Sequence, residues 1–144
     1  MIWPAATSLA ARRHDADRSG DTSAAAWLTE VLRVIPQNAV LVSWWSTSTP
    51  LWYGQLIAGD RPDIRVIDDS NIVYDGWETR ERAIAAFVCQ RPVFMMRLDE
   101  ADLVATRALY VLVPFMDVRV AIGGPTAVAD RTLYRVVAPA SCTS

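Results

Sequence analysis

The apolar run Ala39-Val40-Leu41-Val42 is followed directly by Ser43-Trp44-Trp45-Ser46-Thr47-Ser48-Thr49-Pro50-Leu51-Trp52-Tyr53-Gly54-Gln55, and the two together predict a buried strand followed by a turn and a helix. The run is continuous and rich in β-branched residues, which predicts a strand covered on both faces, as in a parallel sheet. The string after it predicts a hydroxyl-rich turn at the carboxyl end of that strand. A helix then follows, with Ser48 or Thr49 as its cap and Pro50 at its first position.

Strand and helix patterns alternate along the chain around this string. Apolar spacing predicts helices at 24–34 and 78–90 and strands at 64–67 and 92–96. Asp99 is expected to cap a further helix, with Asp102 at the offset of a capping box.

The alternation ends after that helix. Short strands are predicted at 110–115, 118–122 and 132–137, with Gly123-Gly124-Pro125 as a turn, and at least two of them should complete the sheet as antiparallel strands. The whole pattern predicts an α/β fold: a three-layer sandwich with a mainly parallel, Rossmann-like sheet finished by antiparallel C-terminal strands.

The length of 144 residues fits one domain. Mixed charges at the start predict a polar, partly mobile leader over residues 1–22. A single α/β domain is expected over 23–138, with a tail at 139–144. No signal peptide is recognised at the N-terminus and no run is long enough to span a membrane, so the sequence predicts a soluble chain.

Composition argues against several functions. The net charge of −2 gives no basic face for nucleic acid. All 14 basic residues are arginine, which excludes lysine chemistry. The single histidine, His14, lies in the leader without an evident nucleophile. Cys89 and Cys142 are too few for a metal site, and nothing in their placement predicts a disulfide. We therefore expect no catalytic residue, metal or cofactor.

Polar residues follow three of the predicted strands. Residues 43–49 follow the first, Asp68 and Asp69 the second, and Arg97 the third. Because the carboxyl ends of parallel strands meet at one edge of a sheet, these residues are expected to flank a binding crevice. The helix beginning near Pro50 would direct free N–H groups towards that crevice and favour an anion or a polar oxygen there.

These positions define the candidate ligand-binding set: Ser43, Trp44, Trp45, Ser46, Ser48, Thr49, Trp52, Tyr53, Asp68, Asp69 and Arg97. Trp44 or Trp45 would stack on a sugar ring or another flat apolar face. The same residues also have a structural interpretation, because hydroxyls and carboxylates cap helices and tryptophans fill the space between helix and sheet.

Several strings in the chain resemble one known protein family. They are Asp17-Arg18-Ser19, Pro36-Gln37-Asn38-Ala39-Val40-Leu41-Val42-Ser43-Trp44-Trp45, Ser48-Thr49-Pro50-Leu51-Trp52-Tyr53, Arg61-Pro62-Asp63-Ile64, Ile67-Asp68-Asp69, Arg91-Pro92-Val93-Phe94 and Leu133-Tyr134-Arg135-Val136-Val137. In this order, over residues 17–138, they resemble the C-terminal soluble region of bacterial protein O-mannosyltransferase-like membrane proteins, which have the C-type, polyprenyl-phosphate-sugar-dependent glycosyltransferase architecture.

The resemblance implies a non-catalytic accessory domain. In such enzymes a multi-helix membrane portion binds the lipid-linked sugar and supplies an acidic residue that acts as the catalytic base, and no residue of this chain matches that portion. The implied partners are the membrane-embedded portion and a glycan or acceptor polypeptide. The implied location is the extracytoplasmic face when the domain is attached to such a protein, and the cytoplasm otherwise.

Two alternatives remain open from the residues. One is a stand-alone module that binds a nucleotide or sugar phosphate at the helix after Thr49. The other is a domain that only packs against a partner, in which case an exposed apolar patch containing Trp3 or Trp52 is expected.

Overall fold

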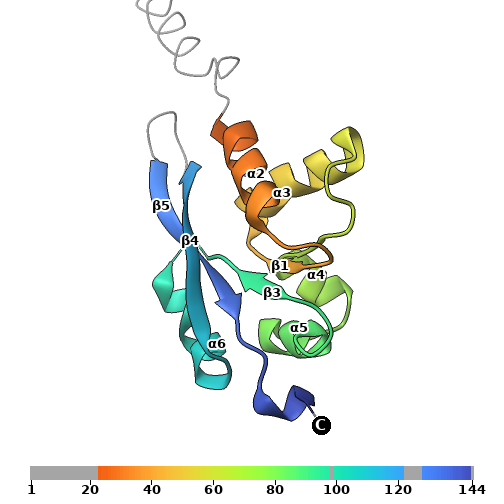
Figure 1. The fold of residues 1–144 in the computed structure, drawn as a ribbon, viewed down its shortest axis with the longest axis vertical. Helices are drawn as coiled ribbons and strands as arrows, with labels where there is room; N and C mark the ends of the chain where they lie inside the picture. The colour runs from red at the N-terminus through yellow and green to blue at the C-terminus, as the bar shows by residue number, and fades with distance from the viewer. Residues whose placement is uncertain (1–22, 98, 122–127, 144) are drawn as a thin grey trace, which may run out of the picture.

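The computed structural model describes residues 23–97, 99–121 and 128–143. The fold is mixed α/β, with helices packed against a five-stranded sheet (Figure 1). Its elements, in chain order, are α2 (Ser23–Val34), β1 (Val40–Val42), α3 (Trp45–Tyr53), the π-helical turn η1 (Gly54–Ala58), β2 (Arg65–Ile67), α4 (Asp69–Tyr74), α5 (Arg80–Phe87), β3 (Val93–Met95), the 3-10 helix η2 (Glu100–Leu103), α6 (Val104–Leu109), β4 (Leu112–Ala121), β5 (Val128–Val136) and the 3-10 helix η3 (Ala140–Thr143). The expected leader with His14, the residue Trp3 and the turn at 123–125 lie outside the described residues.

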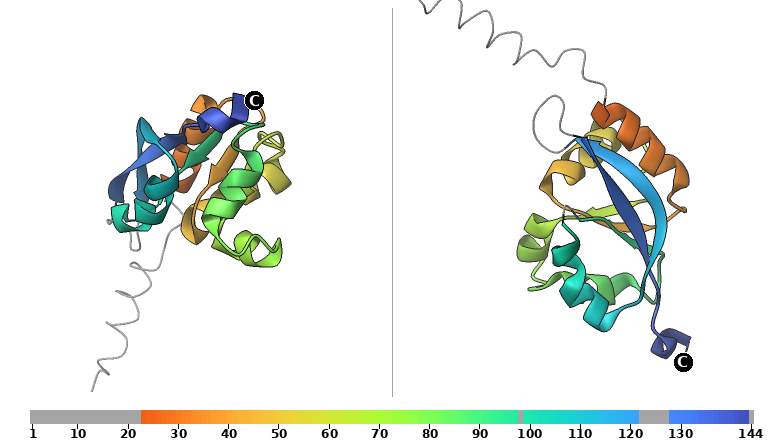
Figure 2. Two further views of the ribbon diagram at one scale, coloured as in Figure 1. Left: turned by 90° about the horizontal axis from the view of Figure 1, so that it is seen from below. Right: turned by 90° about the vertical axis from the view of Figure 1, so that its left-hand side faces the viewer.

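The sheet has the strand order β2-β1-β3-β5-β4. Strand β1 pairs in parallel with β2 and β3, whereas β5 runs antiparallel to both β3 and β4. The antiparallel completion of the sheet by C-terminal strands is confirmed, but the sheet is mixed rather than mainly parallel. The segments predicted at 110–115 and 118–122 merge into one long strand, because only a register shift between Pro114 and Met116 interrupts the ladder. Figure 2 shows the β4–β5 hairpin as a long twisted ribbon on one side of the molecule.

Strand β1 is buried on both faces, as its continuous apolar sequence predicts. Leu41 joins the core cluster that contains Trp27 of α2 and Phe94 of β3. Its neighbours on β1 point to the opposite face and pack with Ile84 of α5. In Figure 1, β1 and β3 accordingly run between α2 and α3 above and α4 and α5 below.

Helix α3 begins at Trp45, five residues before the predicted start at Pro50. Trp44 is the extended residue before it, and Pro50 lies inside the helix. The hydroxyls of Ser48 and Thr49 do not cap a helix. They bond back to the carbonyls of Trp44 and Trp45, at 3.1 and 3.0 Å. Hydroxyls that satisfy carbonyls one turn earlier are compatible with a helix that includes them, and this is why the predicted boundary was wrong.

Two further helix starts differ from expectation. Asp68 caps α4, a helix absent from the sequence prediction, because its carboxylate accepts the N–H groups of Ser70 and Asn71. Asp99, expected to cap the next helix, makes no side-chain cap bond before η2. The Asp102 carboxylate lies 3.6 Å from Nε of Arg97 instead, so the expected capping box does not form.

A disulfide joins Cys89 to Cys142, and the prediction that these cysteines are unpaired was wrong. Cys89 follows α5, and Cys142 belongs to η3 in the expected tail. Because β5 is antiparallel to β3, the chain leaving Val136 continues past Val93 to the end from which β3 begins. The two sulfurs meet there although the cysteines are 53 residues apart. Only the strand order reveals this proximity.

Candidate functional site

Arg97 holds together the ends of two parallel strands and the start of α4. It follows β3 directly, and only 7% of its side chain is exposed. One of its guanidinium nitrogens donates to the carbonyl of Ser43, after β1, at 2.9 Å. The guanidinium also donates to both carboxylate oxygens of Asp69, each at 3.0 Å. The predicted convergence of Ser43, Asp69 and Arg97 is therefore what the structure shows.

A second arginine and a second carboxylate complete this strand-end cluster. Arg80 of α5 lies 3.8 Å from the Asp69 carboxylate and donates to the carbonyl of Asp102 at 2.8 Å. Burial lowers the pKa of Arg80, and the neighbouring charge of Arg97 lowers it further. An adjacent cavity of about 590 Å³ is lined by Asp69, Arg80 and Asp102. Two cations and two carboxylates thus neutralise one another, which leaves little net charge for an added anion.

Several other candidate residues are structural in this fold. The hydroxyls of Ser43 and Ser48 lie 2.6 Å apart and both residues are fully buried. Trp44 is 8% exposed and belongs to the core cluster of α2. Asp68 is buried as the cap of α4. Trp52 is partly buried against the same core as Trp44.

The remaining candidates line a groove between α2 and α3, which we call the aromatic groove. Its α3 side carries Trp45, Ser46, Thr49 and Tyr53. Trp45, Thr49 and Tyr53 recur every four residues, so they share one helix face. The indole of Trp45 is 69% exposed and the ring of Tyr53 64% exposed. Two aromatic surfaces are therefore open to solvent along one wall of a cavity of about 810 Å³.

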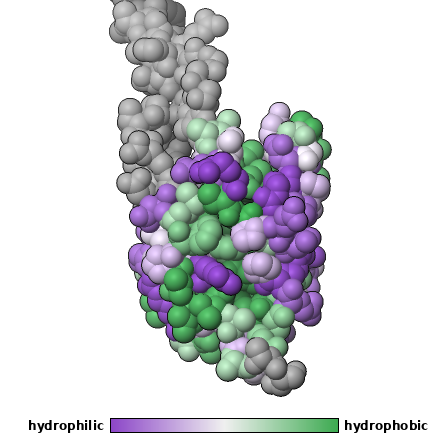
Figure 3. Space-filling model, viewed as in Figure 1, coloured by the Kyte–Doolittle hydropathy of each residue, from purple (hydrophilic) through white to green (hydrophobic). Residues whose placement is uncertain are grey.

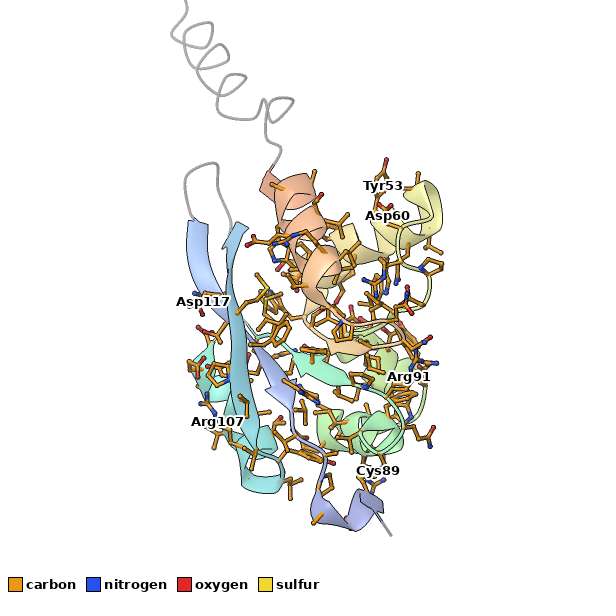
Figure 4. All side chains as sticks on the ribbon, in the orientation of Figure 1. Tyr53, Asp60, Cys89, Arg91, Arg107 and Asp117 are labelled. Carbon is orange, nitrogen blue, oxygen red and sulfur yellow. A yellow bond between two sulfur atoms is a disulfide. The ribbon has the colours of Figure 1, made fainter. Side chains whose placement is uncertain are left out.

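The other wall and the end of the groove come from residues that the sequence did not identify. Helix α2 contributes Ala25, Leu28 and Thr29, and Asp60 follows from the loop after η1. In Figure 4, Tyr53 and Asp60 lie near each other at the same end of the molecule. A Cβ on Gly54 would lie only 2.8 Å from Leu28, so glycine at this position permits the close approach of the two walls.

The aromatic groove combines aromatic faces with hydroxyls and one carboxylate, Asp60, which makes no ion pair with any described residue. Flat rings next to hydrogen-bonding groups suit a sugar ring, because stacking and hydroxyl contacts act together. The groove presents no nucleophile paired with a base. Across the described ranges 23–97, 99–121 and 128–143, no group of three histidine, cysteine or acidic residues is placed to hold a metal.

The candidate set is thus divided among the strand-end cluster, the aromatic groove and structural positions in the core and at the cap of α4. Ser43, Asp69 and Arg97 belong to the strand-end cluster, and Trp45, Ser46, Thr49 and Tyr53 to the aromatic groove. The helix N-terminus on which a phosphate site was expected is at Trp45 and not near Pro50. The four-residue spacing of Trp45, Thr49 and Tyr53 was the sequence signal for the groove, and it becomes visible once α3 begins at Trp45.

Within the part of the chain that the structure describes, each helix falls short of the length and apolar character needed to cross a membrane. The chain matches no protein-family model, no curated protein and no solved structure.

Proposed function

We propose that this chain is the non-catalytic soluble domain of a membrane glycosyltransferase-like protein and that the aromatic groove positions the sugar or the acceptor. The observation that carries the proposal is the pair of exposed rings, Trp45 and Tyr53, on one wall of the groove. Stacking of a sugar ring on these side chains would remove apolar ring surface from water and is the usual way in which proteins hold the flat face of a sugar. The resemblance over residues 17–138 supplies the protein class.

The arrangement of the parallel half supports a Rossmann-like, three-layer interpretation of the fold. Strands β2, β1 and β3 are parallel, and separate core clusters lie on the two faces of β1. In that interpretation the groove lies on the side of α2 and α3, next to the turn that follows β1.

The disulfide supports the extracytoplasmic location. Structural disulfides persist in oxidising compartments and are rare in the cytosol. The bond between Cys89 and Cys142 joins the end of α5 to η3, so it also fastens the C-terminal segment to the body of the domain. A domain beside the active site of a membrane glycosyltransferase, on the outer face of the membrane, would lie in such an oxidising compartment.

The test is a titration with neutral oligosaccharides, using mannose and glucose trimers as probes and NMR chemical-shift mapping as the readout. We expect shifts centred on Trp45 and Tyr53. Trp45→Ala should weaken the affinity about 10-fold or more, which corresponds to about 1.4 kcal/mol or more. Tyr74→Ala is the matched control, because Tyr74 is 86% exposed but belongs to α4. Equal affinity in Trp45→Ala and the unaltered protein would contradict the proposal.

A further inference from the structure

Among residues 23–97, 99–121 and 128–143, no helix covers one half of a sheet face. The register places Phe94 of β3, Arg135 of β5 and Val113 of β4 side by side on the same face. The next pair on that face is Val137 and Val111, joined by a backbone hydrogen bond of 2.9 Å. This is the face that α2 covers elsewhere, since Phe94 belongs to the core cluster of that helix.

The cover by α2 ends partway along the hairpin. Leu133 and Met116 pack with the residues of α2 in one core cluster. Beyond them, Val111 is 65% exposed, Val113 44%, Phe115 43% and Val137 39%. The ring of Phe115 contacts that of Phe94, with centroids 4.9 Å apart, so the open surface continues directly from the core. Figure 3 shows hydrophobic side chains gathered over and beside β4 on this face.

Arg135 gives this open half-face its charge. It is exposed, and its side chain makes no hydrogen bond or ion pair with any described residue. Arg61 and Arg97, in contrast, donate to backbone carbonyls and to carboxylates. A second copy docked about a two-fold axis through the middle of the half-face would bring two Arg135 side chains together, and like charges would oppose it.

We propose that the open half-face, made of Val111, Val113, Phe115, Arg135 and Val137, is covered by an amphipathic helix of a partner polypeptide whose aliphatic face carries one carboxylate. The helix would pack on the valines as α2 packs on the adjoining part of the same face. Its carboxylate would pair with Arg135, which has no counter-ion within the described chain. The proposal concerns a surface separate from the aromatic groove and holds whether or not the groove binds a sugar.

The experiment uses the chain with two synthetic helical peptides of about 18 residues. Both carry leucines at three- and four-residue spacing, and they differ at one central position of the apolar face, which is Glu in one and Lys in the other. Fluorescence anisotropy should show at least 10-fold tighter binding of the Glu peptide, with NMR shifts on β4 and β5. Arg135→Glu should reverse the order of the two peptides. Arg82→Glu is the matched charge reversal on α5 and should leave the order unchanged.

Several results would overturn the proposal. Equal or absent binding of the two peptides would remove the charge complementarity on which it rests. A dimer detected by sedimentation equilibrium and disrupted by Val113→Ser would assign the half-face to a second copy. Binding to phosphatidylglycerol vesicles that Arg135→Glu abolishes would assign it to an anionic lipid surface. Circular dichroism of each variant confirms that a lost signal does not come from unfolding.

Discussion

The strand-end cluster and the aromatic groove both include residues of the segment that follows β1, but the side chains of the cluster are paired within the fold and those of the groove are exposed. In the cluster, the side chain of Arg97 is 7% exposed and bonds to both the Ser43 carbonyl and the Asp69 carboxylate. In the groove, Trp45 and Tyr53 stand largely in water with no ring partner among the described residues. A buried residue that is held by hydrogen bonds and an ion pair within the fold contributes to stability, whereas an exposed aromatic residue is accessible to a ligand.

Trp44 and Trp45 show the same difference between a buried and an exposed residue at adjacent positions. Trp44 is a core residue and Trp45 is 69% exposed. Trp44→Ala should lower the free energy of unfolding by about 3–5 kcal/mol, because it leaves a cavity between α2 and the sheet. Trp45→Ala should change it by about 0.5 kcal/mol or less. Urea unfolding followed by circular dichroism measures both. Similar losses of stability in the two variants would mean that the groove wall is structural.

The next largest effect is expected in the strand-end cluster. Arg97→Met should lower the free energy of unfolding by about 2–4 kcal/mol, because the buried Ser43 carbonyl loses its donor and Asp69 loses its two hydrogen bonds from the guanidinium. Arg135→Met is the matched control and should cost about 0.5 kcal/mol or less, since its guanidinium has no partner among the described residues. Urea midpoints measure both variants. A stable Arg97→Met protein that loses sugar binding would instead make the cluster the ligand site.

The helices and strands with a regular spacing of apolar residues could be predicted from the local sequence pattern. Helix α2, the three parallel strands and α5 were each predicted within a few residues, because each presents an apolar face of the right period. The start of α3 was misplaced because Ser48, Thr49 and Pro50 have the composition of a helix start. The hydroxyls of Ser48 and Thr49 bond to the carbonyls of Trp44 and Trp45 instead, and Trp44 itself packs in the core.

The features that depend on strand order could not be predicted from local pattern. The Cys89–Cys142 bond requires β5 to lie against β3, and no residue near either cysteine encodes that pairing. The wall of the groove formed by Leu28 and Thr29 requires α2 to lie along α3. The sequence could name Trp45 and Tyr53 as candidates, but only the fold separates them from Ser43 and Arg97.

A smaller effect is expected for the buried hydroxyl pair that was first assigned to the ligand site. Ser48→Ala should cost about 1–2 kcal/mol, because the Ser43 hydroxyl loses its partner at 2.6 Å. The double variant Ser43→Ala/Ser48→Ala should cost less than the sum of the single variants, since it removes both groups together. A double-mutant cycle in urea measures this coupling, with the exposed Thr49→Ala as the control. Additive costs would show that the two hydroxyls act independently.

The smallest expected effect on stability is that of replacing Asp63, whose carboxylate is held by Arg61. Asp60, three residues earlier in the chain, lines the aromatic groove and serves for comparison. Two hydrogen bonds from Arg61, together with the backbone N–H of Asn38, hold the pKa of Asp63 well below its ordinary value. Since the pKa of the folded state is the lower one, the ionised carboxylate stabilises the fold above about pH 4, the ordinary value, and this stability is lost as the pH falls further. Asp63→Asn should therefore lower stability by less than about 1 kcal/mol at pH 7 and flatten its decline below pH 4.

Asp60→Asn is the matched control in the groove, because the Asp60 carboxylate makes no ion pair with a described residue. Thermal midpoints recorded from pH 7 to pH 2.5 should follow the unaltered protein in Asp60→Asn and diverge from it in Asp63→Asn. Arg61 also donates to the carbonyls of Leu32 and Ile35 at the end of α2, so the ion pair with Asp63 fixes the helix that forms one wall of the groove. Weaker sugar binding below pH 4 in the unaltered protein, but not in Asp63→Asn, would show that this network positions the groove as well as stabilising the fold.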